Sequence, residues 1–273
     1  MGRRMNLWAR TTLGRTGRAV GKLGLGSGYG ADQRCVEMAF ERGMNYFYWG
    51  TFRRDSYGEG LRALRSKRED FVLVVQSYTR LSSLLGWSLE RALRSLKMDY
   101  ADVLLLGMWN KDVTPRIWER ALKLRERGLV RHLAISTHNR HHAVDLARSK
   151  DIDVLHVRYN AVHPGAETDI FPHLPERAAR PGVVSFTTTS WGELLAPDKV
   201  PAGDRVPTAT DAYRFALSNP NIDVCLAGPK SPEQFQAALA ALDLGPMTDE
   251  EFAWIRRVGK AKYTKPGAFS MRG

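Results

Sequence analysis

Eight short runs of residues that favour β-strands recur along this chain, and longer segments with helical patterning lie between them. Several of the runs are apolar almost throughout, which is typical of strands buried on both faces of a parallel sheet. This alternation predicts an α/β fold. The expected strands cover residues 22–25, 44–47, 71–75, 102–106, 132–135, 154–157, 183–187 and 224–227.

The intervening segments carry the start and stop signals of helices. Pro115 lies in the first turn of one expected helix, which ends before Gly128, and Thr248 opens the last one with a capping-box pattern. The expected helices cover residues 32–42, 82–98, 114–127, 139–149, 166–179, 208–218, 231–242 and 248–263.

Strands and helices in this order, without a repeat boundary, favour one closed (β/α)₈ TIM barrel that spans residues 1–273 as a single domain. A doubly wound open sheet is the alternative, although it usually has about five to seven strands and a glycine-rich first turn. Residues 14–17 are typical of a hairpin turn, so we expect an N-terminal β-hairpin that closes one end of the barrel. Residues 196–207 predict a long loop on the rim that carries barrel active sites.

The net charge of +12 allows an anionic partner, and residues 1–31 contain six basic residues and no acid. A solvated basic rim is the alternative explanation for that segment. The chain shows no RNA-binding motif, no secretory signal and no apolar stretch long enough for a membrane span. The two cysteines lie in apolar segments and are expected to be free thiols. We therefore predict a cytoplasmic protein that binds a small-molecule substrate, without nucleic acid or membrane.

Several segments, in chain order, resemble known landmarks of one family. They are residues 13–17, 23–28, 41–47, 100–106, 128–136, 159–160, 191–195 and 227–239. Together they resemble the aldo-keto reductase superfamily over nearly the whole chain. The resemblance implies a (β/α)₈ barrel and NADPH-dependent reduction of a carbonyl group, with the cofactor extended over the barrel mouth.

The four catalytic positions of that family all carry other residues here. By the resemblance, its Asp falls on Tyr48, its Tyr on Arg53, its Lys on Gln76 and its His on Gly107. The usual proton relay therefore cannot operate, because no lysine lowers the pKa of a phenol and no imidazole polarises the carbonyl. Tyr57 lies about one helical turn beyond the family's Tyr position, and Tyr57 and Gln76 are both candidates for the catalytic centre.

A different catalytic group remains possible. Tyr48 is expected at a strand end that faces the mouth, where it could donate a proton, and Arg53 or Arg54 could supply positive charge. The alternative is that Tyr48 is an aromatic wall of a pocket. His138, which follows the fifth strand, is a further candidate for the pocket.

The positions that bind the cofactor in the family are mixed. The stacking aromatic is missing from residues 187–189, where Phe186 or Trp191 could replace it. Residues 230–234 resemble the segment that holds the 2′-phosphate of NADPH, although a plain helix start is the alternative. By the resemblance, the cofactor-binding candidates are Ser27, Ser136, Thr137, His156, Thr188, Lys230, Ser231 and Gln234.

Other charged residues also fall near the expected mouth. Arg158 follows the sixth strand and suggests a carboxylate or phosphate ligand, with a salt bridge to Asp153 or Glu167 as the alternative. Several histidines gather around His138, but their spacing is not diagnostic of a metal, and we predict none.

Three functions are consistent with these residues. The first is an NADPH-dependent oxidoreductase with an altered catalytic centre. The second is a catalytically silent barrel that binds a nucleotide or metabolite and acts through a protein partner. The third is a non-redox barrel enzyme, such as a lyase or a metal-assisted hydrolase.

Overall fold

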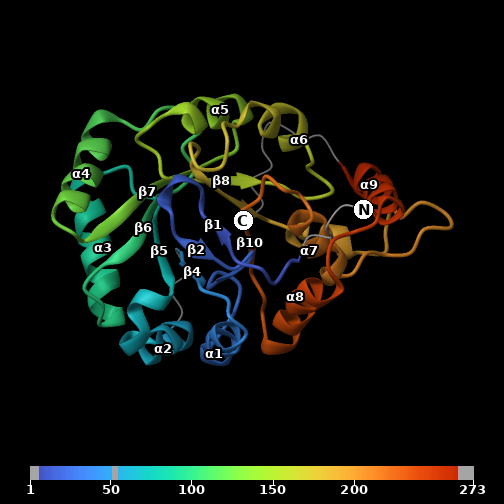
Figure 1. The fold of residues 1–273 in the computed structure, drawn as a ribbon, viewed down its shortest axis with the longest axis horizontal. Helices are drawn as coiled ribbons and strands as arrows, with labels where there is room; N and C mark the ends of the chain where they lie inside the picture. Colours follow the sequence, from blue (N-terminus) through green and yellow to red (C-terminus); the bar gives the residue numbers. More distant parts are fainter. Residues whose placement is uncertain (1–5, 51–54, 264–273) are drawn as a thin grey trace.

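A computed structural model describes residues 6–50 and 55–263 of the chain. Eight parallel strands form a closed barrel in the order β10-β3-β4-β5-β6-β7-β8-β9 (Figure 1). The predicted barrel and its eight strands are confirmed, with ends that shift by up to a few residues. The strands are β3 Leu23–Gly26, β4 Tyr46–Trp49, β5 Val72–Ser77, β6 Ala101–Leu106, β7 Val130–Thr137, β8 Val154–Arg158, β9 Gly182–Phe186 and β10 Val224–Ala227.

The predicted N-terminal hairpin is also confirmed. Strand β1 (Thr11–Thr12) pairs antiparallel with β2 (Ala19–Val20) around a short 3-10 turn, and Leu13 and Val20 pack against the apolar interior of the barrel. The fit is close, because a Cβ atom on Gly182 would lie 2.5 Å from the Leu13 side chain. The hairpin therefore closes the N-terminal end of the barrel and leaves the carboxyl ends of the strands as its mouth.

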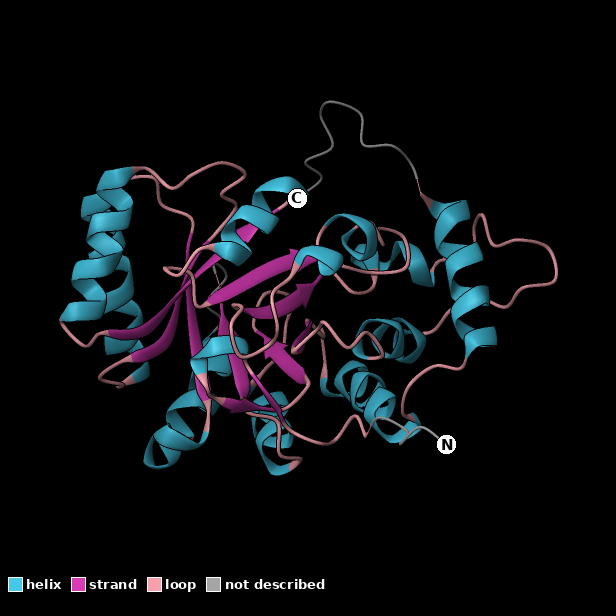
Figure 2. Cartoon of the chain, turned by 45° about the horizontal axis from the view of Figure 1, so that its top comes forward, coloured by secondary structure: helices cyan, strands magenta, loops and turns pink. Residues whose placement is uncertain are grey.

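Helices surround the barrel, with their apolar faces against the outer side of the strands (Figure 2). The predicted capping box of the last helix is present, and Thr208 forms a second one at α7. The helices are α1 Gln33–Glu41, α2 Asp55–Ala63, α3 Ser82–Leu96, α4 Pro115–Glu126, α5 Arg140–Arg148, α6 Ala166–Asp169, α7 Ala209–Leu217, α8 Pro232–Leu244 and α9 Asp249–Lys262.

Two helices differ from the sequence prediction. The helix expected over 166–179 ends at Asp169, because Pro172 and Pro175 interrupt the chain and leave only a short 3-10 turn beyond it. Helix α2 is absent from the predicted set because its two glycines weaken the helical signal. Gly60 is required there, since a Cβ atom at this position would lie 2.7 Å from the Val36 side chain of α1.

Three other expectations can be compared with the structure. Residues 196–207 form an irregular loop, as predicted, and Lys262 donates hydrogen bonds to two of its carbonyl groups. Cys35 and Cys225 are buried free thiols, which confirms that prediction. Within the described part of the chain, no helix is long and apolar enough to cross a membrane.

Alternation along the strands decides which side chains enter the barrel. One set of residues packs together inside it, and the residues between them face the helices. On β4, β5, β7 and β8 the next inward position toward the mouth is polar, whereas on β9 and β10 it is Phe186 and Leu226. The inner set comprises Leu13, Val20, Tyr46, Val72, Val74, Val103, Leu105, Ala134, Val154, Val184 and Val224. The polar positions that follow it are Tyr48, Gln76, Ser136, His156 and Arg158.

A buried ion pair fixes the opposite end of the barrel. Asp223 is fully buried and accepts hydrogen bonds from both terminal nitrogens of Arg180, at 2.7 and 3.0 Å, and from the Val183 amide at 2.9 Å. Arg177 lies 3.2 Å from the same carboxylate. The pair joins the segment before β9 to the start of β10.

Removing Arg180 should strongly destabilise the fold. We expect Arg180→Met to lower the free energy of unfolding by about 3 kcal/mol, because a buried carboxylate loses its main partner while Arg177 remains. Urea unfolding of both proteins measures this change. Arg94→Met is the control, since Arg94 is 67% exposed and should change stability by less than about 0.5 kcal/mol. Equal effects of the two substitutions would contradict the role of the buried pair.

Candidate active site

The floor of the mouth is a buried tyrosine–histidine pair. The Tyr46 hydroxyl lies 3.0 Å from His156 Nε2, and both residues are buried inside the barrel. Burial lowers the pKa of His156 to about 3 and raises the pKa of Tyr46 well above its usual value. Both groups are therefore neutral at neutral pH. Tyr46 was not among the predicted site residues, although it precedes Tyr48 by two positions and so faces the same side.

Above this pair lies Tyr48, which is half-buried at the end of β4. Its hydroxyl donates a hydrogen bond to Gln76 Oε1, and its ring centroid is 6.3 Å from that of His156. Gly50 leaves room for the phenol, since a Cβ atom there would lie 2.5 Å from the Tyr48 hydroxyl oxygen. The structure thus brings together Tyr48, Gln76 and His156, three of the predicted site residues.

Ser136 and Thr137 hold a neighbouring loop at the end of β7. Ser136 Oγ accepts a hydrogen bond from the Met108 amide at 2.9 Å, and the Thr137 hydroxyl donates to Asn110 Oδ1 at 3.2 Å. Both side chains are nearly inaccessible to solvent. Both residues therefore fix the β6–α4 loop over the barrel.

His138 lies at the rim. It is half-buried, and its ring meets Phe186 edge-on at a centroid distance of 5.6 Å. Burial, together with the positive charge of Arg158, lowers the pKa of His138. The imidazole is therefore neutral at neutral pH and stands beside the ring that ends β9.

The first turn of α8 uses most of its polar groups internally. Ser231 Oγ accepts a hydrogen bond from the Gln234 amide at 3.4 Å, and Gln234 Oε1 accepts one from the Lys230 amide at 2.9 Å. The helix start considered as the alternative thus accounts for Ser231 and Gln234. The Lys230 side chain is exposed beside them.

A cavity of about 380 Å³ lies at the rim, between the β5–α3 and β6–α4 loops, and Arg80 forms part of its lining. The Arg80 guanidinium stacks over Trp109, 4.1 Å from the ring centroid. It also donates hydrogen bonds to the carbonyl oxygens of Gly107 and Met108 at 3.0 and 2.8 Å. This arginine ties the two loops together beside the mouth.

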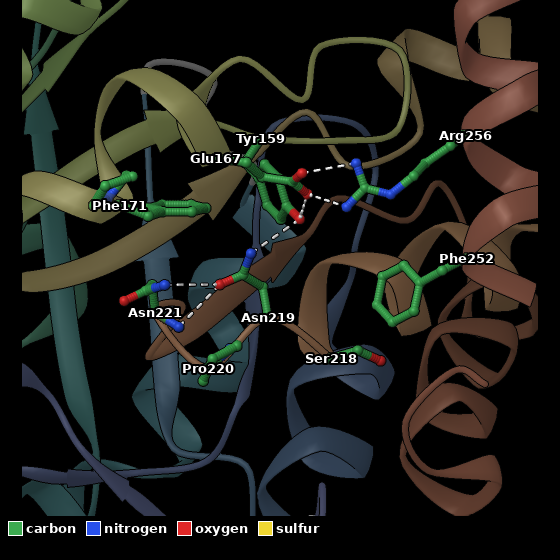
Figure 3. Close-up of a pocket in the computed structure, with 10 residues that line it drawn as sticks. Tyr159, Glu167, Phe171, Ser218, Asn219, Pro220, Asn221, Phe252 and Arg256 are labelled. Carbon is green, nitrogen blue, oxygen red and sulfur yellow. Dashed lines mark hydrogen bonds and ion pairs between the residues drawn. The ribbon is translucent and has the colours of Figure 1, made fainter. Parts of the chain in front are cut away.

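A second cavity, of about 400 Å³, is lined by Tyr159 just after β8, by residues of α6 and α9, and by the segment 218–221 that follows α7 (Figure 3). Tyr159 donates a hydrogen bond to Glu167 at 2.5 Å, Arg256 forms an ion pair with the same carboxylate at 2.7 Å, and Asn219 donates to the Tyr159 hydroxyl at 3.1 Å. These polar groups satisfy one another. The cavity contains none of the residues that line the mouth, so we do not assign the reaction to it.

Comparison with known protein families shows to which family this barrel belongs. A sequence profile of the Aldo/keto reductase family matches residues 31–186, more than half of the 273 residues. The chain belongs to the aldo/keto reductase family. It is 24% identical over 279 residues to L-galactose dehydrogenase from Arabidopsis thaliana, a match that covers 84% of this chain and 86% of that protein.

Solved structures of aldo/keto reductases share the fold. Aldo-keto reductase AKR11C1 from Bacillus halodurans, in its holo form, matches with a TM-score of 0.77 and 20% identity over 94% of this chain and 98% of the other. The apo form of the same protein gives a TM-score of 0.73 over the same coverage. At this level of identity the likeness extends to the fold alone.

In this aldo/keto reductase Gln76 and Gly107 are packed against one another. A Cβ atom on Gly107 would lie 2.4 Å from Gln76 Nε2 and 2.5 Å from the ring of Tyr78. The space where the resemblance expects a histidine side chain is therefore filled by the glutamine amide and by Tyr78. Glycine is the residue that fits, and a histidine would require both side chains to move.

Two predicted site residues do not face the mouth of this aldo/keto reductase. Tyr57 is fully buried on α2, behind the barrel wall, and its hydroxyl donates to the Leu25 carbonyl at 2.7 Å. Thr188 Oγ1 lies 3.2 Å from Cys225 Sγ, among the residues that pack against the helices. Both residues are near the mouth in sequence, but their side chains turn to the outer layer.

Of the remaining candidates, the structure describes Ser27 but neither Arg53 nor Arg54. The Ser27 hydroxyl accepts a hydrogen bond from the Gly50 amide at 3.3 Å, which joins the ends of β3 and β4. Arg53 and Arg54 lie outside the described residues. Within residues 6–50 and 55–263, no group of three or more His, Cys, Asp or Glu side chains could hold a metal ion.

The buried imidazole predicts a dependence of stability on pH. The unfolded chain binds a proton at His156 below about pH 6.5, whereas the folded chain keeps it neutral down to about pH 3. Proton uptake therefore favours unfolding, and this residue alone should cost about 1.4 kcal/mol per pH unit as the pH falls through that window.

His156→Gln should reduce this slope, because glutamine takes up no proton. Urea unfolding between pH 6.5 and 4.5 measures it for both proteins. His138 and His163 also have lowered pKa values, so some slope will remain. His141→Gln is the control, since His141 is exposed and its removal should leave the slope unchanged. If the slope is unchanged in His156→Gln, the lowered pKa of His156 is refuted.

Proposed function

We propose that this protein is an oxidoreductase that reduces a carbonyl group with NADPH, and that Tyr48 is its proton donor. Family membership supports the oxidoreductase function. The observation that carries the assignment of Tyr48 is its place at the mouth, with its hydroxyl bonded to Gln76 and its ring next to the neutral His156.

The chemistry requires an acid close to the carbonyl oxygen, because that oxygen gains negative charge as hydride reaches the carbon. The Tyr48 hydroxyl can donate its proton there. The Gln76 side chain can rotate to present Nε2 instead of Oε1, and its N–H would then stabilise the phenolate that remains. A neutral amide does this less well than the lysine of the family, so we expect slow turnover.

The residues present fit NADPH at both ends, although not at every position. Lys230 is an exposed cation at the N-terminus of the 13-residue helix α8, which suits a phosphate group. Ser136 and the free ring nitrogen of the neutral His156 would hold the nicotinamide amide. When bound, the cofactor supplies the hydride. Thr188 does not fit, because its hydroxyl lies against Cys225, and Phe186 is the ring placed to stack at the mouth.

Tyr48→Phe tests the proton donor. We expect turnover to fall by about 100-fold or more, because a general acid contributes that much, while the affinity for NADPH stays the same. Consumption of NADPH with a panel of aldehydes and ketones measures the first, and fluorescence titration the second. Tyr100→Phe is the control, since Tyr100 directly precedes β6 at the end of the barrel opposite the mouth. Full activity in Tyr48→Phe would exclude this residue as the donor.

Lys230→Ala tests the phosphate contact. Its ammonium should contribute to NADPH but little to NADH, which lacks the 2′-phosphate, so the Kd for NADPH should rise about 10-fold more than the Kd for NADH. Fluorescence titration with both nucleotides measures the two values. Lys123→Ala, at an exposed position of α4, should change neither. Equal effects on the two nucleotides would remove Lys230 from this role.

A catalytically silent barrel is the second candidate. The observation in its favour is that all four catalytic positions of the family carry other residues, with the space at Gly107 already filled. The two functions differ in one measurement. A protein that binds NADPH tightly but consumes none with any carbonyl compound of the panel would be a silent binding barrel.

A further inference from the structure

We propose that Arg158 binds an anionic group of the substrate, so that the carbonyl compound carries a carboxylate or a phosphate. This inference names the substrate class of the proposed function and rests on it. Arginine suits either anion, because its planar guanidinium can donate two parallel hydrogen bonds.

The backbone directs Arg158 into the mouth. It is the last residue of β8 and follows Val154 and His156 at intervals of two, so that its side chain leaves the strand on the inner side. Its Cα partner on β9 is Phe186, whose ring contacts His138. Arg158 is half-buried and lies one layer above His156.

Neither of the salt bridges that the sequence suggests for Arg158, to Asp153 or to Glu167, is formed. Asp153 accepts a hydrogen bond from the Leu133 amide at 2.8 Å and lies 3.7 Å from Arg125. Glu167 is occupied by Arg256 and Tyr159.

Across the part of the chain that the structure describes, no hydrogen bond or ion pair to the Arg158 guanidinium is found.

The neighbours of Arg158 are mostly basic. Burial and the nearby Arg140 lower the pKa of Arg158, with a smaller opposite effect of Tyr263. Burial, Arg158, Arg140 and His138 together lower the pKa of His163 to about 4. Arg140 is paired with Asp169, and the His163 ring contacts Tyr263. Among the described residues, Arg158 is therefore a partly desolvated charge without a counterion, and such a charge costs free energy that a bound anion would offset.

The position across the barrel favours the substrate over the cofactor as the source of the anion. In the strand order, β8 lies opposite β4, the strand of Tyr48, and two strands away from β10, which leads to Lys230. A small molecule with its carbonyl oxygen at Tyr48 can extend over His156 and place an anionic group at Arg158. Lys230 remains available for the phosphate of the cofactor.

Paired substrates test this inference through turnover. We expect the wild type to reduce 4-carboxybenzaldehyde with a higher kcat/KM than benzaldehyde. Arg158→Gln should lower kcat/KM for the carboxylate at least about 10-fold and change that for benzaldehyde less than about twofold. Arg94→Gln, an exposed arginine on α3, is the control and should change neither. A carboxylate preference that survives in Arg158→Gln would overturn the proposal.

A binding experiment tests the anion site independently of catalysis. Calorimetry with benzoate, inorganic phosphate and benzyl alcohol should show that Arg158→Gln weakens only the anions, and the stronger anion identifies the group. If nothing is reduced but benzoate or phosphate binding still depends on Arg158, the anion site stands and the proposed reductase function falls. If neither anion distinguishes the wild type from Arg158→Gln, the anion site is refuted.

Two further measurements keep the result unambiguous. If Arg158→Gln lowers the affinity for NADPH as much as that for the carboxylate, the guanidinium serves the phosphates of the cofactor and the proposal is wrong. If Arg158→Gln does not fold, Arg158→Lys keeps the charge but loses the planar donor pair. Arg158→Lys should then lower kcat/KM for 4-carboxybenzaldehyde and leave that for benzaldehyde unchanged, and no loss with the carboxylate would overturn the proposal.

Discussion

Closure of the barrel is the constraint on which the site depends. Because side chains alternate along each strand, the closed sheet sends every second residue inward, and the apolar interior fixes which ones they are. Val74 is therefore followed by Gln76, and Val154 by His156 and Arg158, on the same inner face. A shift of one residue in any strand would exchange these groups with side chains that pack against the helices.

The polar side chains at the floor of the mouth form one connected set. Tyr46 and His156 are neutral because the barrel interior excludes water, and Tyr48 and Gln76 complete the layer above them. Gly107 leaves the space that the Gln76 amide occupies. A side chain at position 107 would collide with Gln76 and Tyr78, so glycine at this position and glutamine at position 76 form one packing arrangement.

The sequence predicts the strands well because strands buried on both faces are apolar throughout, and it predicts the mouth residues through their place at strand ends. The sequence prediction fails where a contact in the outer layer decides the direction of a side chain. Tyr57 and Thr188 lie close to the mouth along the chain, yet their hydroxyl groups find partners at Leu25 and Cys225. Helix α2 depends on its contact with α1 at Gly60, which no local pattern reveals.

Net charge alone could not separate an anionic ligand from a solvated basic rim. Most of the buried or half-buried arginines are matched, as Arg180 is by Asp223 and Arg214 by Glu251. The acid in each pair compensates the charge of the arginine and leaves no free charge for a ligand. Arg158 differs because the acids near it in sequence already serve other arginines. Among the described residues, Arg158 combines an inner strand end, partial burial and the lack of an acidic partner, which net charge alone could not reveal.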